Sequence, residues 1–202
     1  MKFYAVPGNH DRLTNKNFSQ KWLNTFGPTA RLEKHGKLQI LLLDTGNGYL
    51  ADKEANIKAV EALDPALPVV VISHYQLVGD GYLKDKDRAI HDSEKAAGLL
   101  KKLAAMQGVI IVGHKNIATS AKLGNLLQVN MPQLTQFPAG VIYAELFTDG
   151  IRLEFVTAHN EFFDEYGRIR GNIMGQKQRF RDRHSLTVWN NFYKLDLKAA
   201  GN

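Results

Sequence analysis

Apolar strands that alternate with helical segments constrain the fold of this chain more than any other feature. Runs of apolar residues without alternation occur at 41–43, 69–72 and 109–112. Strands of this kind are typical of parallel sheets, whose two faces are both covered. Helical patterns separate them, at 51–63 and at 93–106, the second with Ser93 as its predicted N-cap. The sequence therefore predicts an α/β fold.

The two ends of the chain differ from this central pattern. Residues 2–6 are predicted to form a strand that ends in a polar turn, and Phe18, Trp22 and Phe26 give the next helix an aromatic face. Further strands are predicted at 30–33, 38–44, 126–131, 141–147, 151–156 and near 185–189. Because strands dominate the second half, we expect a partly antiparallel second sheet. We expect one domain over residues 1–202, since no clear linker divides the chain.

Composition excludes several classes of site. The chain has no cysteine, which rules out a disulfide framework, a thiolate zinc site and a cysteine nucleophile. No apolar run approaches the roughly 20 residues that span a bilayer, so no membrane span is expected. The formal net charge of +6 favours anionic partners, although surplus lysine on a solvated surface gives the same value. Localisation stays open, since a bacterial cytoplasm and a periplasm are both compatible with this composition.

Polar residues follow several of the predicted strands directly. Gly8-Asn9-His10-Asp11 follows the first strand, His74 follows the run at 69–72, and His114 follows the run at 109–112. Sites in open α/β sheets form at such carboxyl ends. Taken singly, Asn9 and Asp11 are also good turn formers, and His74 and His114 can be capping or core histidines. Their ordered placement at strand ends favours a functional set.

These blocks resemble those of the calcineurin-like metallophosphoesterases. The matches are Gly8-Asn9-His10-Asp11, the histidine of Ile72-Ser73-His74, and part of a Gly-His-x-His block in Gly113-His114-Lys115-Asn116. The resemblance begins at the family's Gly-Asn-His-Asp block and covers nearly the whole chain. It implies the family's layered two-sheet sandwich, here lacking its N-terminal strands. It also implies metal-dependent hydrolysis of phosphomonoesters or phosphodiesters.

The resemblance assigns one metal ion to residues at three strand ends. Asn9, His74 and His114 correspond to its ligands, through a carboxamide oxygen and two imidazoles. Such donors suit manganese, iron or zinc. Asn116 stands where the family has a second histidine of the other metal, and a neutral carboxamide is at most a weak ligand there.

The resemblance also implies roles in catalysis. His10 corresponds to the general acid that faces the substrate phosphate and protonates the leaving group. Asp11 corresponds to the residue that orients His10 by hydrogen bonding. Tyr75 and His91 are candidates for contact with the substrate phosphate, with packing and surface roles as their alternatives.

One half of the family's site is absent from this sequence. The Asp-x-His and Gly-Asp blocks, which carry the bridging carboxylate, precede Gly-Asn-His-Asp in the family, and here that block begins at residue 8. We therefore expect one bound ion or none, and impaired hydrolysis by this chain alone. Three explanations stay open: a start placed inside an existing strand, a non-catalytic relative, or completion by a partner chain. A strand at 2–6 without its neighbours would also be an open edge that favours self-association.

A second function follows from basic residues near the C-terminus. Lys177, Arg179, Arg181 and Arg183 alternate with other residues, and Arg168 and Arg170 lie nearby. As a strand, the segment 168–183 would present cations on one face and contact a nucleic-acid or other polyanion backbone. The alternative is a solvated strand face or loop, because no aromatic stacking pattern accompanies the charges.

Overall fold

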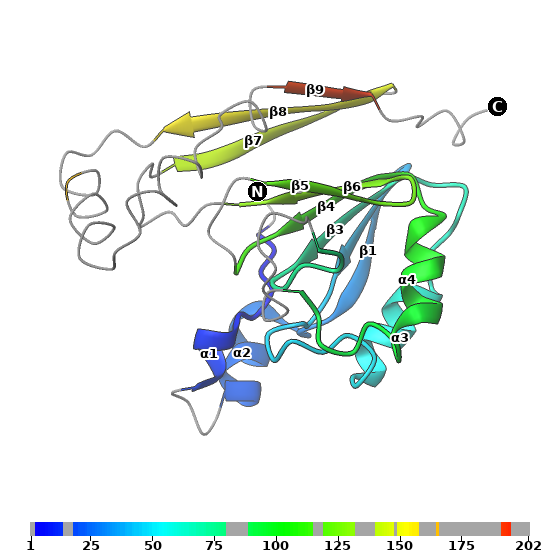
Figure 1. Cartoon of the computed structure of the whole chain (residues 1–202). Helices are drawn as coiled ribbons and strands as arrows, with labels where there is room; N and C mark the ends of the chain where they lie inside the picture. Colours follow the sequence, from blue (N-terminus) through cyan, green and yellow to red (C-terminus); the bar gives the residue numbers. More distant parts are fainter. Residues whose placement is uncertain are drawn as a thin grey trace.

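A mixed sheet of six strands forms the centre of the fold in the computed structural model (Figure 1). The structure describes residues 3–13, 18–79, 89–114, 119–131, 140–147, 149–157, 165 and 191–194. The strands are β1 (Arg31–His35), β2 (Leu38–Leu42), β3 (Val69–Ser73), β4 (Gly108–Val112), β5 (Ser120–Leu123) and β6 (Leu126–Asn130), in the order β1-β2-β3-β4-β6-β5. The inner four are parallel to one another, and β1 and β5 are antiparallel edge strands.

The predicted apolar runs become the centre of this sheet. β3 is Val-Val-Val-Ile-Ser and β4 is Gly-Val-Ile-Ile-Val, which are rich in the β-branched residues that suit a strand. Val69, Val71, Val109 and Ile110 are fully buried. Covering both faces of a parallel sheet removes this apolar surface from water, which is the main stabilising term.

The two faces of the sheet are covered by different layers. Helices α3 (Glu54–Glu61) and α4 (Ala97–Ala104) lie on one face, and a second sheet lies over the other (Figure 1). This antiparallel sheet consists of β7 (Gly140–Phe147), β8 (Gly150–Thr157) and β9 (Asn191–Lys194). Val60 and Leu103 from the helices pack on one face, and Ile151 and Leu153 from β8 pack on the other. The expected α/β class and the second antiparallel sheet are therefore confirmed.

The strand predicted at residues 2–6 is wrong for the part that the structure describes. Residues 3–8 have no strand assignment, and the short helix α1 (Asn9–Leu13) follows them. The edge beside β2 is occupied by β1, which the tight turn at Gly36 folds back in antiparallel pairing. The expected self-association depended on an open edge strand at 2–6, and the described residues of this segment do not form that strand.

Helix boundaries and one strand also differ from expectation. The aromatic helix is confirmed as α2 (Phe18–Phe26), with Trp22 buried between the rings of Phe18 and Phe26. Ser93 does not cap the next predicted helix, because residues 91–96 form turns and α4 begins at Ala97. The hairpin strand β5 was not predicted, and the strand expected near 185–189 lies outside the described residues. None of the described helices is long and apolar enough to cross a membrane.

The two hairpin turns of the large sheet provide a matched test of its docking on α4. Gly36 and Gly124 share a left-handed φ of 58°, but a Cβ at Gly124 would lie 2.1 Å from the Ala104 carbonyl oxygen, whereas one at Gly36 meets nothing within 4 Å. Gly36→Ala should lower the free energy of unfolding by about 1–2 kcal/mol, the cost of a left-handed non-glycine residue. Gly124→Ala should cost about 1–3 kcal/mol more, because the turn must leave α4. Urea unfolding measures both, and equal losses would contradict this docking.

Candidate metal centre

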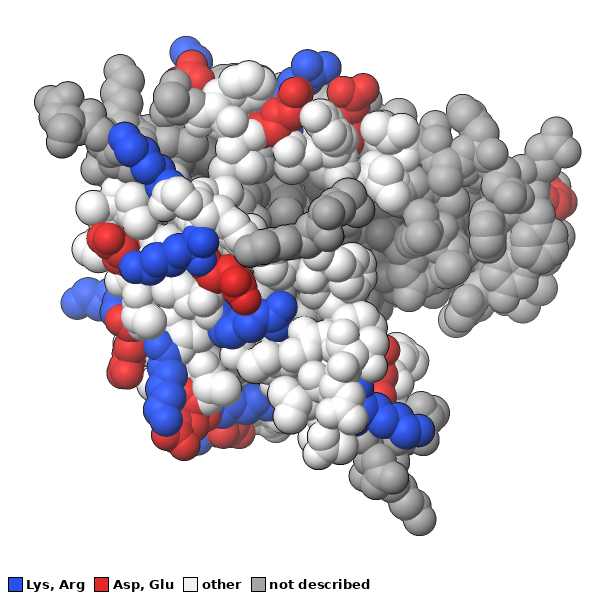
Figure 2. Space-filling model, turned by 180° about the vertical axis from the view of Figure 1, so that it is seen from behind, with Lys and Arg blue, Asp and Glu red and all other residues white. Residues whose placement is uncertain are grey.

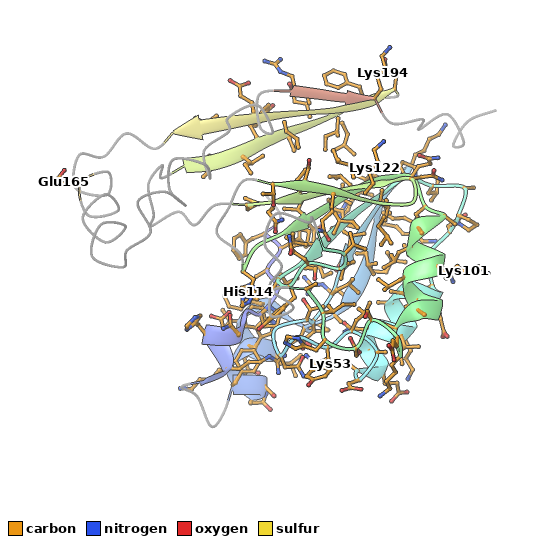
Figure 3. The ribbon with its side chains drawn as sticks, viewed as in Figure 1. Lys53, Lys101, His114, Lys122, Glu165 and Lys194 are labelled. Atoms are coloured by element: carbon orange, nitrogen blue, oxygen red, sulfur yellow. The ribbon has the colours of Figure 1, made fainter. Side chains whose placement is uncertain are left out.

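Three segments that are far apart in the sequence bring Asn9, His74 and His114 together. Asn9 begins α1, His74 directly follows β3, and His114 follows β4 after one glycine. The Asn9 Oδ1 atom lies 2.9 Å from His74 Nε2, and His114 Nδ1 lies 3.2 Å from the same nitrogen. Figure 3 places His114 beside α1, at the carboxyl ends of the parallel strands. The residues that the sequence predicted as ligands of one ion therefore converge.

Two glycines lie beside the His74 ring, and one of them leaves the ring the space it occupies. A Cβ at Gly8 would lie 2.9 Å from His74 Cε1, which is closer than side-chain carbons approach one another. A Cβ at Gly113 would lie 3.6 Å from His74 Nδ1, an ordinary contact. The Gly113 amide also donates to the His74 carbonyl oxygen at 3.1 Å. Gly8 is thus required by the ring, whereas Gly113 connects the backbones of the two strand ends.

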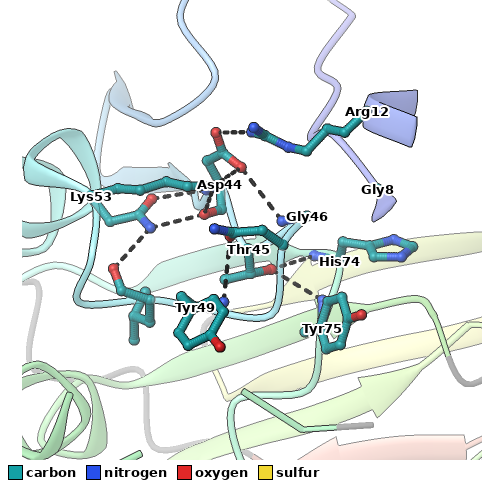
Figure 4. A network of polar contacts seen from close by, with 12 residues as sticks. Gly8, Arg12, Asp44, Thr45, Gly46, Tyr49, Lys53, His74 and Tyr75 are labelled. Carbon is teal, nitrogen blue, oxygen red and sulfur yellow. Dashed lines mark hydrogen bonds and ion pairs between the residues drawn. The ribbon is translucent and has the colours of Figure 1, made fainter. Parts of the chain in front are cut away.

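The hydroxyl of Thr45 fixes the loop that carries His74 (Figure 4). Thr45 Oγ1 accepts from the amides of His74 and Tyr75, at 3.1 and 3.0 Å. It also lies 2.8 Å from Ser73 Oγ, which donates to the Tyr75 carbonyl oxygen at 2.9 Å. Since Ser73 uses its proton there, Thr45 donates to Ser73. Thr45 is fully buried and Ser73 nearly so, and sequence analysis assigned a role to neither.

His114 adopts a backbone conformation that side-chain-bearing residues seldom occupy. Its φ is 61°, in the left-handed region, where histidine is more frequent than most residues. The Tyr75 ring stacks on the His114 ring, with centroids 3.9 Å apart. The rings of Tyr75 and the exposed His91 are arranged edge to face, with their centroids 5.6 Å apart. A strained backbone persists only where its surroundings hold it, and such residues cluster at functional sites.

Burial keeps the His74 ring neutral. The pKa of His74 is lowered from 6.5 to about 4, mainly by burial and in part by the nearby His114 and His10, whereas Asp11 opposes the change. An unprotonated imidazole offers a lone pair to a metal, whereas the imidazolium offers none. At neutral pH the ring is therefore in the form that a ligand needs.

The other predicted residues differ in how closely they approach this cluster. His10 is exposed on α1, and its charge acts on His74. The Asp11 carboxylate accepts the Gly8 amide at 2.7 Å, so it closes the turn before α1, and its predicted orientation of His10 stays a prediction. His91 contacts Tyr75, whose ring in turn stacks on His114. Asn116 lies outside the described residues.

A buried carboxylate beside the cluster is neutralised by two cations. Arg12 and Lys53 both form ion pairs with Asp44, which is 3% exposed (Figure 4). Burial alone would raise the pKa of the Asp44 carboxyl, but Lys53 and Arg12 hold this pKa below its ordinary value. Among the residues that the structure describes, no three His, Cys, Asp or Glu side chains are grouped to hold a metal. The converging donors are therefore neutral: one carboxamide and two imidazoles.

Comparisons of the sequence with known proteins assign this chain to no family. The sequence matches no model of a known protein family, and no curated protein sequence matches it significantly. The resemblance to metallophosphoesterases therefore depends on its motif residues alone.

The two glycines beside His74 should respond differently to the same substitution. Gly8→Ala should displace the imidazole and separate His74 from Asn9, because the new methyl group would overlap the ring. Gly113→Ala should leave the ring in place, because its methyl group has room. Nuclear Overhauser contacts from residue 8 and Asn9 to the His74 ring protons report the change. Loss of these contacts in both variants, or in neither, would contradict the packing.

Stability of the metal-free protein should depend on pH through His74. The unfolded chain takes up a proton at His74 near pH 6.5, whereas the folded state does so only near 4. The unfolded state binds more protons in this window, so the free energy of unfolding should fall as the pH is lowered from 6.5 to about 4. Chemical denaturation at a series of pH values in the presence of a chelator measures this fall. His74→Gln should flatten the profile in this window, and an unchanged profile would refute the assignment.

Proposed function

We propose that this chain binds one divalent metal ion through Asn9, His74 and His114, and that the ion serves the hydrolysis of phosphate esters. The observation that carries the proposal is the convergence of their three donor atoms, with spacings of 2.9 and 3.2 Å around His74 Nε2. The phosphate-ester chemistry is supported by the order of the motif residues, which resembles that of calcineurin-like metallophosphoesterases. The ester class, monoester or diester, is left to experiment.

The donor spacing agrees with a shared ion. Ligand atoms about 2.0–2.1 Å from one ion are separated by about 2.9 Å at a right angle and about 3.3 Å at a tetrahedral angle. The two separations around His74 lie within this interval. Imidazole nitrogen and carboxamide oxygen suit manganese, iron or zinc. The low pKa of His74 favours binding further, because no proton has to leave this ring at neutral pH.

Different residues of the chain would bind the ion and transfer a proton. A bound divalent ion would act as a Lewis acid that neutralises phosphate charge and lowers the pKa of a bound water. Asn9, His74 and His114 hold it, and Gly8 and Thr45 keep the His74 ring in position. His10 is exposed next to Asn9, where it can donate a proton to a leaving oxygen of substrate.

The neutrality of the donor set limits both affinity and rate. No carboxylate within the described part of the chain joins the three donors to offset the charge of the ion. A single ion on neutral ligands does not clamp both the attacking and the leaving oxygen, as two-metal sites do. We therefore propose weak metal binding and slow hydrolysis for this chain alone.

Binding of a polyanion through the segment 168–183 is not developed further. That segment lies outside the described residues. On the face shown in Figure 2, Lys and Arg side chains alternate with Asp and Glu, and the described residues form no broad basic field. The salt dependence of binding to short DNA or RNA tests this alternative directly.

Metal titration with variants of the cluster tests the proposed function. The chain should bind one Mn²⁺ or Zn²⁺ ion, and His74→Ala or His114→Ala should abolish binding because each removes an imidazole ligand. His35→Ala is the matched control, since His35 lies on β1 and contacts Tyr4 instead of the cluster. His10→Ala should retain the ion and lower hydrolysis of p-nitrophenyl phosphate or its bis ester by about 10²–10⁴-fold.

The outcomes separate the two parts of the proposal. Absence of metal binding by the unaltered chain would refute the site. Metal binding without any hydrolysis of either ester, even at high Mn²⁺ concentration, would refute the assigned chemistry. Two tightly bound ions with rapid turnover would show that other residues complete a dinuclear centre, against the single neutral site proposed.

A further inference from the structure

The segment that carries Asn9 and His10 is attached to the sheet through a charged contact. Residues 3–8 have no strand assignment, so no ladder of backbone hydrogen bonds fixes this segment to β1. Arg12, on α1 directly after Asp11, reaches across to Asp44 at the end of β2. Figure 4 shows the guanidinium directed at the Asp44 carboxylate, between α1 and the strand end.

Asp44 is a rigid anchor for this contact. Its backbone amide donates to Asn56 Oδ1 at 2.8 Å, and its carbonyl oxygen accepts Asn56 Nδ2 at 2.9 Å. Lys53 Nζ donates to the Asp44 carboxylate at 2.6 Å and to its carbonyl oxygen at 3.0 Å. Asn56 is fully buried at the start of α3. The Asp44 carboxylate is therefore held in one position, and it can hold the Arg12 guanidinium in place.

Close packing at the same place makes the position of Arg12 specific. A Cβ at Gly46 would lie 2.7 Å from the Pro7 carbonyl oxygen and 3.0 Å from Arg12 Nε, so both approach the backbone closely. The guanidinium also lies over the Phe18 ring, 4.8 Å from its centroid. A planar guanidinium held by an ion pair, an aromatic face and a glycine is not reproduced by the point charge of a lysine.

We propose that Arg12 is a positioning residue for the metal centre: by pairing with Asp44 it holds α1 so that Asn9 meets His74. This inference rests on the proposed function for its consequence in metal binding, but the contact between Asn9 and His74 exists without metal. Arg12 touches neither the donors nor substrate in this role. It acts through the start of α1, in the way that outer residues orient metal ligands.

Lys53 allows the positioning role to be separated from a general contribution to stability. Both cations pair with Asp44, but Lys53 belongs to the segment before α3, and the ion pair and hydrogen bonds of its side chain are made to Asp44. Removing either cation leaves the buried carboxylate with one cationic partner, which destabilises the fold in both variants. Of the two cations, Arg12 is the one that lies on the helix carrying Asn9, so its loss acts directly on the position of that helix.

The experiment compares Arg12→Gln, Arg12→Lys and Lys53→Met in the full chain. Arg12→Gln should lower Mn²⁺ affinity about 10–100-fold, the usual effect of losing a residue that orients a ligand. Lys53→Met should leave the affinity within about twofold, even where urea unfolding shows equal loss of stability in the two variants. Arg12→Lys should fall between the unaltered chain and Arg12→Gln, because it restores charge without the planar shape.

A second measurement keeps the inference testable without metal. Nuclear Overhauser contacts between the Gly8 α-protons and the His74 ring should be present in the unaltered chain and in Lys53→Met, and lost in Arg12→Gln. Retention of these contacts in Arg12→Gln, or their equal loss in Lys53→Met, would overturn the positioning role. If the unaltered chain binds no Mn²⁺, the proposed function fails, and the metal-free contacts still decide the role of Arg12.

Discussion

Parallel pairing of β2, β3 and β4 is the constraint on which the rest of this structure depends. Because the three strands run in the same direction in adjacent positions, their carboxyl ends form one edge, where Thr45, His74 and His114 follow. Val71 and Ile110 are paired on the face that the helices cover, and Val70 and Val109 are paired on the face under the second sheet. A slip by one residue would exchange these two sets between faces that are packed by different layers. The hydroxyl of Thr45 then converts the proximity of two strand ends into a fixed loop geometry.

Local patterns predicted the parts of the fold that local physics determines. The β-branched runs at 69–72 and 109–112 have few alternatives to a buried strand, and the aromatic spacing of Phe18, Trp22 and Phe26 has few alternatives to a helix face. The described residues 3–6 form no strand because an apolar segment also needs a free partner, and β1 occupies the position beside β2. Competition for an edge depends on pairing between distant residues, which no local pattern records.

The candidate site was predictable in its donors and not in its supports. The strand-end positions of Asn9, His74 and His114 pointed to a cluster, and their atoms meet. Arg12 and Asp44 are separated by 32 positions, and nothing in either neighbourhood marks them as a pair. Thr45 and Ser73 resemble ordinary polar residues after strands, and their hydrogen-bonded arrangement exists only once β2 and β3 are side by side.

The contact between Gly8 and the His74 ring also affects which substitutions the lineage of this chain can accept, and in which order. Any side chain at position 8 overlaps the imidazole, so the glycine can be replaced without cost only after the histidine has gone. Once position 74 holds a small residue, the steric reason for glycine at position 8 disappears. The two positions are therefore epistatic, and a descendant should lose His74 before it acquires a side chain at position 8.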